Sequence, residues 1–542
     1  MDSPLAATYN TGGARVKKAL PALLLLAAAE LLSFGPFIAH RGFCADDWIF
    51  LHIGFQAGGL AAAVRAMAAG GFWARPAEII EYPLLYAAGL SHPAFDQAVL
   101  LVLKIVEGGL LFLLLENLLE WRFLALAAAL LSLTYPIRSA THLWFANAPQ
   151  SLCLVLTLAS LLLHERWIRT RRAGELAGSL ACYLLGLLSY ESAAFAPLIL
   201  GAGLAARRIL SGTSARKALA AVAKDLLPYA WALGAGLLWM WGGAFLLTGA
   251  ANPKPLQLSL DAVAGVYWAA ALAMTRDVFL LCAKSAPLAA RYFPLPFLLA
   301  GGAAFLLAAF GPRAEPEPEA GVRRRALLVA CAMGAAAFVA GYAPYGFSRH
   351  PYLPDVLGIM NRINAVGAWS AGLLLAAALA AVFPDRPRAR QAVLAAVLAA
   401  FAWTNAIACL QWALAWQAQR GILAKAAPLA RALPPGSMVV LTGAPARISG
   451  APVFTESWDF DDALKLATGR EDLAGRVAGA RLRFEETAVV ESPDAAHWPR
   501  AEDWRYPYHD LYLYRADRGV LERLDGPPKE PLSARRTITA TR

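Results

Sequence analysis

Long apolar runs recur along most of this 542-residue chain, and they constrain its fold more than any other feature. The chain is 58% hydrophobic and 16% charged, whereas a soluble protein of this size carries more charge. Most runs are long enough, or nearly so, to cross a bilayer as a helix. The sequence therefore predicts an all-α polytopic membrane protein with about eleven transmembrane helices. We expect them at residues 19–38, 97–119, 123–136, 148–164, 175–189, 192–206, 226–248, 293–310, 326–343, 366–383 and 392–414.

Basic residues gather in the short connections between these runs. The formal net charge of +11 is therefore a topological signal and does not indicate nucleic-acid binding. If the N-terminus is cytoplasmic, the connections on its side hold about twice as many Lys and Arg residues as those on the other side. An odd number of spans then places the C-terminus outside the cytoplasm.

Three longer connections fall on the outer side, at about residues 39–96, 249–292 and 344–365. The first contains several aromatic residues among small ones and is typical of helices lying in the membrane interface. The other two combine aromatic and basic residues.

The composition changes after residue 415. Residues 437–441 and 511–514 have strand-like patterns, and residues 459–467 have a helical one. We therefore expect a transmembrane domain over residues 1–419 and a small α/β domain, large enough for a modest core, over residues 420–542 outside the membrane.

Two adjacent carboxylates, Asp46 and Asp47, stand just after the first apolar run. Acidic side chains at the edge of a membrane span are costly to keep unless they have a role. One of them is a candidate general base for an acceptor hydroxyl, and the other would help to tune its pKa. The alternative is a helix N-cap at the start of the interfacial segment, which Asp favours.

Basic residues of the outer connections are candidates for binding a phosphate. Arg75 lies beside aromatic residues, where it would either clamp a phosphate or contact lipid headgroups. Arg349, His350 and Arg362 form a cationic cluster suited to a phosphate leaving group, or simply a solvated basic loop. His142 would line the same cavity or be structural.

Glu191 stands between two expected spans that almost no loop separates, so we expect its carboxylate to have a partner or a catalytic role. Lys104 and Glu107 are three residues apart within one run and are expected to pair with each other. The sequence offers no explanation for Glu30 in the first run.

The search for cofactor motifs is negative. The sequence has no Walker loop, no Rossmann glycine pattern and no zinc-protease motif, so nucleotide hydrolysis is not expected. Its six cysteines do not have metal-ligand spacing, and five lie in or beside apolar runs. A divalent metal is compatible with a phosphate-binding site, but no ligand cluster is visible.

The motifs together resemble the GT-C superfamily of polyprenyl-phosphate-sugar-dependent glycosyltransferases, in particular bacterial relatives of protein mannosyltransferases and aminoarabinose transferases. The resemblance rests on Asp46-Asp47-Trp48, Arg75-Pro76, Tyr190-Glu191 and Asn361-Arg362, and on a C-terminal domain outside the membrane. It implies that Asp46 or Asp47 acts as base or binds the acceptor, and that Arg349 or Arg362, with Arg75, holds the lipid phosphate. The chain departs from the family in having no acidic residue at 137–147, a place that Glu191 would fill.

The sequence thus predicts a glycosyltransferase of the bacterial inner membrane. Its partners would be a polyprenyl-phosphate-linked sugar, an acceptor on a glycan, lipid or protein at the periplasmic face, and the bilayer itself. One alternative is a transporter or lipid-linked glycan flippase, which would place polar groups near the bilayer midplane and often repeats its fold. Another is a non-catalytic scaffold with an outer binding domain. An O-antigen polymerase or ligase would differ in using a diphosphate-linked donor.

Overall fold

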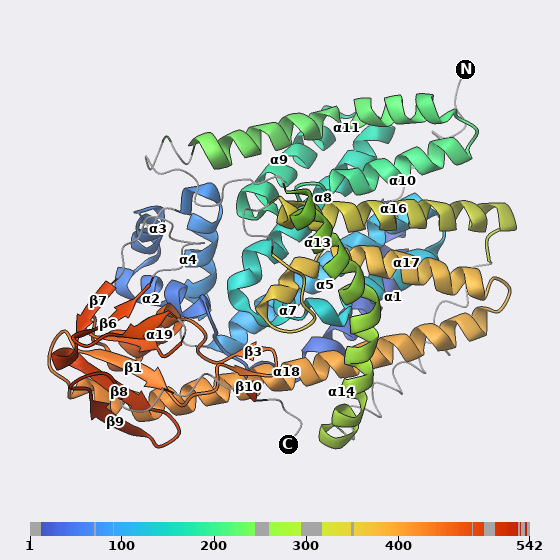
Figure 1. Cartoon of the computed structure of the whole chain (residues 1–542). Helices are drawn as coiled ribbons and strands as arrows, with labels where there is room; N and C mark the ends of the chain where they lie inside the picture. Colours follow the sequence, from blue (N-terminus) through green and yellow to red (C-terminus); the bar gives the residue numbers. More distant parts are fainter. Residues whose placement is uncertain are drawn as a thin grey trace.

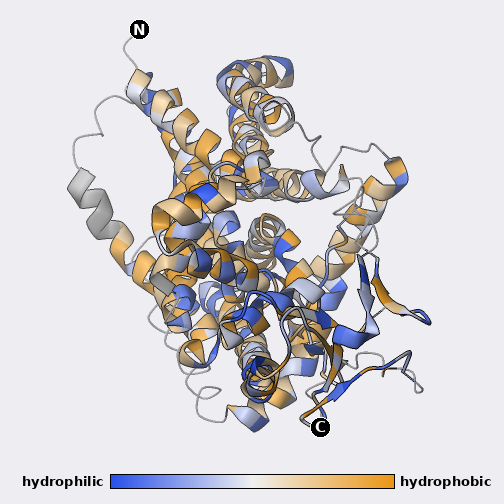
Figure 2. Cartoon of the chain, turned by 90° about the vertical axis from the view of Figure 1, so that its left-hand side faces the viewer, coloured by the Kyte–Doolittle hydropathy of each residue, from blue (hydrophilic) through white to orange (hydrophobic). Residues whose placement is uncertain are grey.

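The computed structural model shows a helical bundle joined to a small domain that contains strands (Figure 1). The two parts differ in hydropathy, because apolar residues are spread over the helices of the bundle and the strands carry more polar ones (Figure 2). The structure describes residues 12–542 except 70–71, 90–91, 244–245, 247–258, 294–316, 348–351, 480, 493–503, 529–531, 533–536 and 539–542.

The bundle consists mainly of apolar helices that follow most of the expected runs. Its helices are α1 (Gly12–Phe34), α5 (Pro93–Leu119), α6 (Arg122–Leu133), α8 (Ala148–Thr170), α9 (Ala173–Ser189), α10 (Pro197–Leu210), α11 (Ala215–Leu238), α13 (Leu260–Leu272), α14 (Val278–Tyr292), α16 (Ala320–Gly346), α17 (Gly367–Val382) and α18 (Pro387–Arg431).

Six segments of the described residues are long and apolar enough to cross a membrane, judged by length and composition. They are Pro93–Leu119, Phe145–Thr170, Glu191–Leu210, Leu260–Tyr292, Ala320–Gly346 and Pro387–Arg431. Five shorter apolar helices accompany them, including Ala19–Phe34 and Gly367–Val382. The chain is thus a multi-pass helical protein, but the predicted count of eleven is not confirmed. The span expected at 293–310 lies almost wholly outside the described residues.

The prediction of an outer loop at 249–292 is wrong for residues 260–292. There α13 and α14 form one helical stretch through a π-helical turn at Ala273–Asp277, and this stretch is among the six candidate spans. Charged residues of this stretch interrupt the apolar pattern of the sequence. Two of them, Arg276 and Asp277, form an ion pair with 2.7 Å between Nε and Oδ1. The stretch is a candidate span by length and composition, so the span count from which the outside position of the C-terminus was predicted is not confirmed.

Helices of the bundle core approach closely where small residues meet. A Cβ atom placed on Gly372 of α17 would lie 2.0 Å from Ser132 Oγ and 2.5 Å from the Ala128 carbonyl oxygen of α6. Glycine is therefore required at this crossing, as is common where helices pack within membranes. Around it, Leu124 and Trp369 belong to one continuous buried cluster that extends across the bundle.

A buried ion cluster connects three parts of the bundle. Glu107 of α5 accepts from Lys104 Nζ at 2.8 Å and from Arg138 Nη2 at 2.8 and 2.9 Å. Trp369 Nε1 of α17 donates to the same carboxylate at 3.1 Å. The expected pairing of Lys104 with Glu107 is confirmed, and Arg138 is the additional partner. These side chains are almost fully inaccessible to solvent.

Arg138 belongs to a short irregular segment that turns within the bundle. It runs through η4 (Pro136–Arg138), α7 (Ala140–Leu143) and η5 (Phe145–Asn147), and we call it the 136–147 segment. Asn361 accepts from Ala140 N at 2.8 Å, and Asn364 donates to the Ile137 carbonyl at 2.8 Å. Because non-helical backbone inside a bundle must find partners, these two asparagines stabilise the turn.

The residues between the first two helices of the bundle fold into short helices, as predicted. They are α2 (Asp47–Ala57), α3 (Leu60–Ala69), η3 (Phe72–Ala74) and α4 (Glu78–Gly89). Figure 1 shows them at one end of the bundle, beside the C-terminal domain. Helix α19 (Ser457–Thr468) of that domain packs against α2.

The C-terminal domain has the predicted α/β character. Strands β1 (Met438–Thr442), β4 (Ala474–Val477), β8 (Leu511–Arg515) and β9 (Val520–Arg523) form a sheet in the order β4-β1-β8-β9, in which only β9 is antiparallel. Two small sheets contain β2 (Arg447–Ile448), β3 (Ala451–Pro452) and β10 (Thr537–Ile538), and β5 (Leu482–Phe484), β6 (Ala488–Glu491) and β7 (Trp504–Pro507).

The expected boundary at residue 420 falls inside α18, which continues without interruption to Arg431. At 1.5 Å per residue, its 45 residues span roughly 68 Å, about twice the hydrocarbon thickness of a bilayer. The strands begin only at Met438. Helix α18 thus continues from the bundle to the residues just before the first strand of the domain.

We expect Glu107→Gln to lower stability by about 3–5 kcal/mol, because the change leaves Lys104 and Arg138 buried without a counter-charge. The measurement is thermal unfolding of the purified protein in detergent. Glu116→Gln on the same helix is the matched control, since its pair with Arg122 is partly exposed and should contribute under about 1 kcal/mol. Equal unfolding temperatures in the two variants would contradict the structural role of the cluster.

Candidate active site

Asp47 is a buried residue at the start of α2, and its hydrogen bonds hold this helix in place. Its carboxylate accepts from Cys44 N at 2.8 Å, Tyr86 Oη at 2.7 Å and Ala146 N at 2.6 Å. Burial raises the pKa of Asp47 to about 7, although these three hydrogen bonds oppose the change. Asp47 thus ties α2 to α4 and to the 136–147 segment, and its oxygens are already occupied.

Asp46 has a different environment from its neighbour. It is half-buried and occupies the N-cap position of α2, but its side chain makes no capping hydrogen bond. The preceding Ala45 has φ 49°, a left-handed conformation that turns the chain into the helix. Asp46 Oδ1 instead accepts from Trp458 Nε1 of the C-terminal domain at 3.2 Å. Of the two aspartates, Asp46 is therefore the one placed to meet a substrate.

Arg362 lies within electrostatic range of Asp46, although the two residues come from opposite parts of the chain. Its guanidinium stands over the ring of Trp144 at 4.9 Å from the centroid. Burial alone would lower the pKa of Arg362, but interactions with Tyr190 and Asp46 leave the pKa above its usual value. Among the described residues, Arg75 forms an ion pair with Glu191, whereas no carboxylate lies within ion-pair distance of the Arg362 guanidinium.

Arg75 and Glu191 bind each other in this structure. Arg75 Nε and Nη2 donate to the two oxygens of Glu191 at 2.8 and 2.6 Å, and Nη1 reaches Glu78 at 3.2 Å. The guanidinium also stands 4.0 Å from the centroid of the Tyr190 ring. Burial would lower the pKa of Arg75, yet the two carboxylates raise it well above its usual value. Arg75 is thus held by two acids, and Glu191 has the basic partner that its position required.

Tyr190 connects this pair to Arg362, because it interacts electrostatically with both arginines. Four of the predicted site residues therefore lie in one region, namely Asp46, Arg75, Glu191 and Arg362. Two others, Arg349 and His350, lie outside the described residues.

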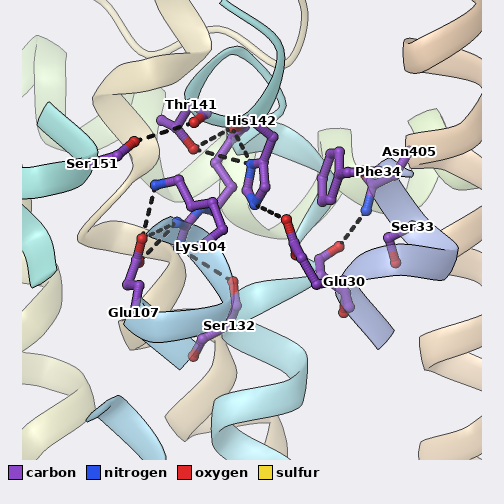
Figure 3. Close-up of polar contacts among 12 residues, drawn as sticks. Glu30, Ser33, Phe34, Lys104, Glu107, Ser132, Thr141, His142, Ser151 and Asn405 are labelled. Carbon is purple, nitrogen blue, oxygen red and sulfur yellow. Dashed lines mark hydrogen bonds and ion pairs between the residues drawn. The ribbon is translucent and has the colours of Figure 1, made fainter. Parts of the chain in front are cut away.

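His142 lies in the interior of the bundle, beside Phe34 and Glu30 (Figure 3). Its ring stacks on Phe34 at 3.8 Å between centroids, and Nε2 lies 3.4 Å from Glu30 Oε1. Glu30, which the sequence left unexplained, is thus the partner of His142. Since His142 is 2% exposed, its placement favours the structural alternative over contact with a substrate.

Residues of the C-terminal domain also reach the site, although nothing in the sequence pointed to them. Trp458 contacts Asp46. Asp459 is buried and interacts electrostatically with Asp46. The pKa of Asp459 lies well above its usual value, because of burial first and then the charge of Asp46. No local pattern marks these residues, since their proximity depends on how α19 docks on α2.

The docking of α19 on α2 is itself polar. His52 Nδ1 lies 2.6 Å from Asp462 Oδ1, and its Nε2 lies 3.0 Å from Glu471. Trp48 Nε1 donates to Gln419 Oε1 at 2.8 Å. Burial would lower the pKa of His52, but the two acids raise it above its usual value. A protonated His52 therefore strengthens the contact.

Within the described residues, no group of three or more His, Cys, Asp or Glu side chains is arranged to hold a metal ion. The cysteines described there are all free. The groups that the site offers for chemistry are carboxylates, arginines and aromatic residues.

Comparisons with known proteins give a distant structural similarity. No family model and no curated protein matches the chain. Among solved structures, it is similar to ArnT from Cupriavidus metallidurans bound to undecaprenyl phosphate, with 12% identity and a TM-score of 0.41, over 85% of this chain and 86% of that one.

Asp47→Asn should destabilise the protein by about 1–3 kcal/mol, because one carboxylate oxygen becomes an amide that cannot accept from its present donor. Asp46→Asn is the control, since the side chain of Asp46 makes no cap and is half-exposed. Thermal unfolding of both variants in detergent measures the difference. The anchor role of Asp47 is wrong if the two variants unfold at the same temperature.

The contribution of His52 to stability should depend on pH. Because the folded pKa lies above the unfolded value of about 6.5, that contribution is fully present below pH 6.5 and is lost as pH rises through the folded pKa. His52→Gln should therefore unfold at a lower temperature than the wild type at pH 6, and the difference should shrink at alkaline pH. His509→Gln, at an exposed pair with Asp510, is the control. A His52→Gln deficit that does not change with pH contradicts this role of the protonated ring.

Proposed function

We propose that this chain is a membrane glycosyltransferase that moves a sugar from a polyprenyl-phosphate donor to an acceptor hydroxyl on a glycan, lipid or protein at the periplasmic face. The observation that supports it is the electrostatic interaction of Asp46 with Arg362, whose guanidinium lies over the Trp144 ring, while Trp144 Nε1 donates to the Cys44 carbonyl beside the aspartate pair. A carboxylate near a guanidinium provides one group for the acceptor and one for the departing phosphate.

The proposed reaction is a direct displacement at the anomeric carbon. Asp46 accepts the proton of the acceptor hydroxyl as the oxygen attacks. The bond between the anomeric carbon and the phosphate oxygen breaks, and the electron pair leaves with the polyprenyl phosphate. Arg362 stabilises the negative charge that grows on that phosphate. Attack from the opposite face inverts the anomeric configuration.

The Arg75–Glu191 pair has a supporting part in this proposal. Both nitrogens that face Glu191 are used, and a third contacts Glu78, so Arg75 offers little to a phosphate in this arrangement. The pair instead fixes Tyr190 beneath the guanidinium, near Arg362. We therefore assign the donor phosphate to Arg362. Glu191 has only a positioning role, in contrast to the acceptor role that the resemblance implied.

Asp46→Asn should lower the rate of sugar transfer by about 100-fold or more, since a positioned base contributes about 10²–10⁴-fold. The assay is release of polyprenyl phosphate from a panel of polyprenyl-phosphate sugars by protein in liposomes that contain envelope lipids. Asp525→Asn, at a side chain that is 85% exposed in the C-terminal domain, is the control. Arg362→Gln should raise KM for the donor and lower kcat, and Arg362→Lys should be less affected.

Full activity of Asp46→Asn would remove the mechanism. Movement of an unchanged lipid-linked sugar across the bilayer, without release of polyprenyl phosphate, would favour a flippase instead. A function that needs the C-terminal domain but tolerates Asp46→Asn and Arg362→Gln would favour the scaffold.

A further inference from the structure

The C-terminal domain contacts both halves of the candidate site. On one side, Trp458 Nε1 donates to Asp46 Oδ1 at 3.2 Å. On the other, the loop between β2 and β3 lies against the residues that precede Arg362. A Cβ atom placed on Gly450 would lie 2.5 Å from Gly358 N and 2.8 Å from Leu357 Cβ. The domain therefore contacts both Asp46 and the residues that precede Arg362.

Trp458 is held in place by the start of its own helix. Glu456 and Asp459 form a capping box around the first turn of α19. Asp459 is fully buried, and its Oδ2 also accepts from Thr455 N at 3.2 Å and from the Thr455 hydroxyl at 3.1 Å. The Arg481 guanidinium lies 5.8 Å from the centroid of the Trp458 ring. A donor fixed in this way restricts the rotamer of the carboxylate that it contacts.

The docking that brings Trp458 to Asp46 is specific and not a loose contact. The same face of α2 is joined to α19 and to the turn after it through His52 with Asp462 and Glu471, and to α18 through Trp48 with Gln419. Phe460 and Ala463 of α19 belong to the same buried cluster as Trp48 and Leu51 of α2. Polar and apolar contacts together fix the relative position of the two helices.

The second contact depends on two glycines. Gly358 has φ 81°, a conformation that favours glycine, and it stands at the N-cap of the turn η9 (Ile359–Asn364) that carries Arg362. Gly450 leaves no room for a side chain against that backbone. The loop of the C-terminal domain therefore limits how far the start of η9 can move.

We propose that the C-terminal domain is an integral part of the active site, in which Trp458 is a positioning residue for Asp46 and Gly450 sets the position of the segment that carries Arg362. The inference rests on the proposed function. The domain holds the base and the phosphate-binding arginine at a fixed separation. Accurate separation matters, because reacting groups must be aligned closely for a displacement of this kind.

The first test is Trp458→Phe in the full-length protein, which keeps an aromatic ring and removes the N–H donor. We expect kcat to fall about tenfold, as for loss of a hydrogen bond to a charged group, with KM for the donor nearly unchanged. The acid limb of the pH profile of kcat/KM should move to higher pH, because the donor stabilises the ionised carboxylate. A purely structural role would not move that limb.

Trp504→Phe is the matched control, since Trp504 lies on β7 and is 49% exposed. The double variant Asp46→Asn/Trp458→Phe should have the same residual rate as Asp46→Asn alone, because Trp458 acts through Asp46. A wild-type kcat and pH profile in Trp458→Phe would overturn the proposal. A rise in kcat would also overturn it, because it would mean that Trp458 hinders access of the substrate to Asp46.

The second test does not depend on how Trp458→Phe folds. Gly450→Ala adds a methyl group where none fits, so it should displace the start of η9 and raise KM for the polyprenyl-phosphate donor severalfold. Gly526→Ala is the control, because a Cβ atom there meets nothing within 4 Å. An unchanged KM in Gly450→Ala would overturn the second half of the proposal.

The proposed function and the role of the C-terminal domain can fail separately. If Asp46→Asn is fully active, the proposed function fails, and the role of Trp458 fails with it. If Asp46→Asn is inactive and both Trp458→Phe and Gly450→Ala behave as wild type, only the inference about the C-terminal domain fails.

Discussion

The rest of the structure depends on the interactions of the buried Glu107 carboxylate. It is surrounded by Lys104, Arg138 and the Trp369 indole in the interior of a bundle filled mainly by Leu and Ala. Two cations cannot remain in such surroundings without a counter-charge. Glu107 therefore determines where Arg138 lies, and with it the start of the irregular 136–147 segment.

From that segment the contacts lead to the candidate site. At the far end of the segment, Ala146 N donates to the Asp47 carboxylate, and Trp144 Nε1 donates to the Cys44 carbonyl at 3.2 Å. The Trp144 ring also lies beneath Arg362. The segment thus joins the ion cluster at one end to the aspartate pair and Arg362 at the other. A rigid interior of this kind suits a site that must hold charged groups at a fixed separation.

Much of the fold could be predicted from the sequence, because apolar runs and strand patterns are local signals. Most expected spans correspond to helices, and the strands at 437–441 and 511–514 are present as β1 and β8. One error has a local cause, because charged residues within 260–292 obscured a long helix. The change in composition after residue 415 falls inside α18, which continues to Arg431. For the site, the sequence identified Asp46 and Arg362 as residue types suited to the chemistry, but it did not distinguish between the two aspartates.

By itself, the sequence determined that this chain belongs in a membrane and which of its charged residues are candidates for a function. Both follow from composition and spacing. Only the tertiary structure decided their roles. It buried Asp47 under three donors and left Asp46 half-exposed, and it joined Arg75 to Glu191 while leaving Arg362 over an aromatic ring. It also brought Trp458 to Asp46 from 412 positions away. The physical reason is that burial and the choice of partner depend on which distant segments pack together, and no local pattern records that packing.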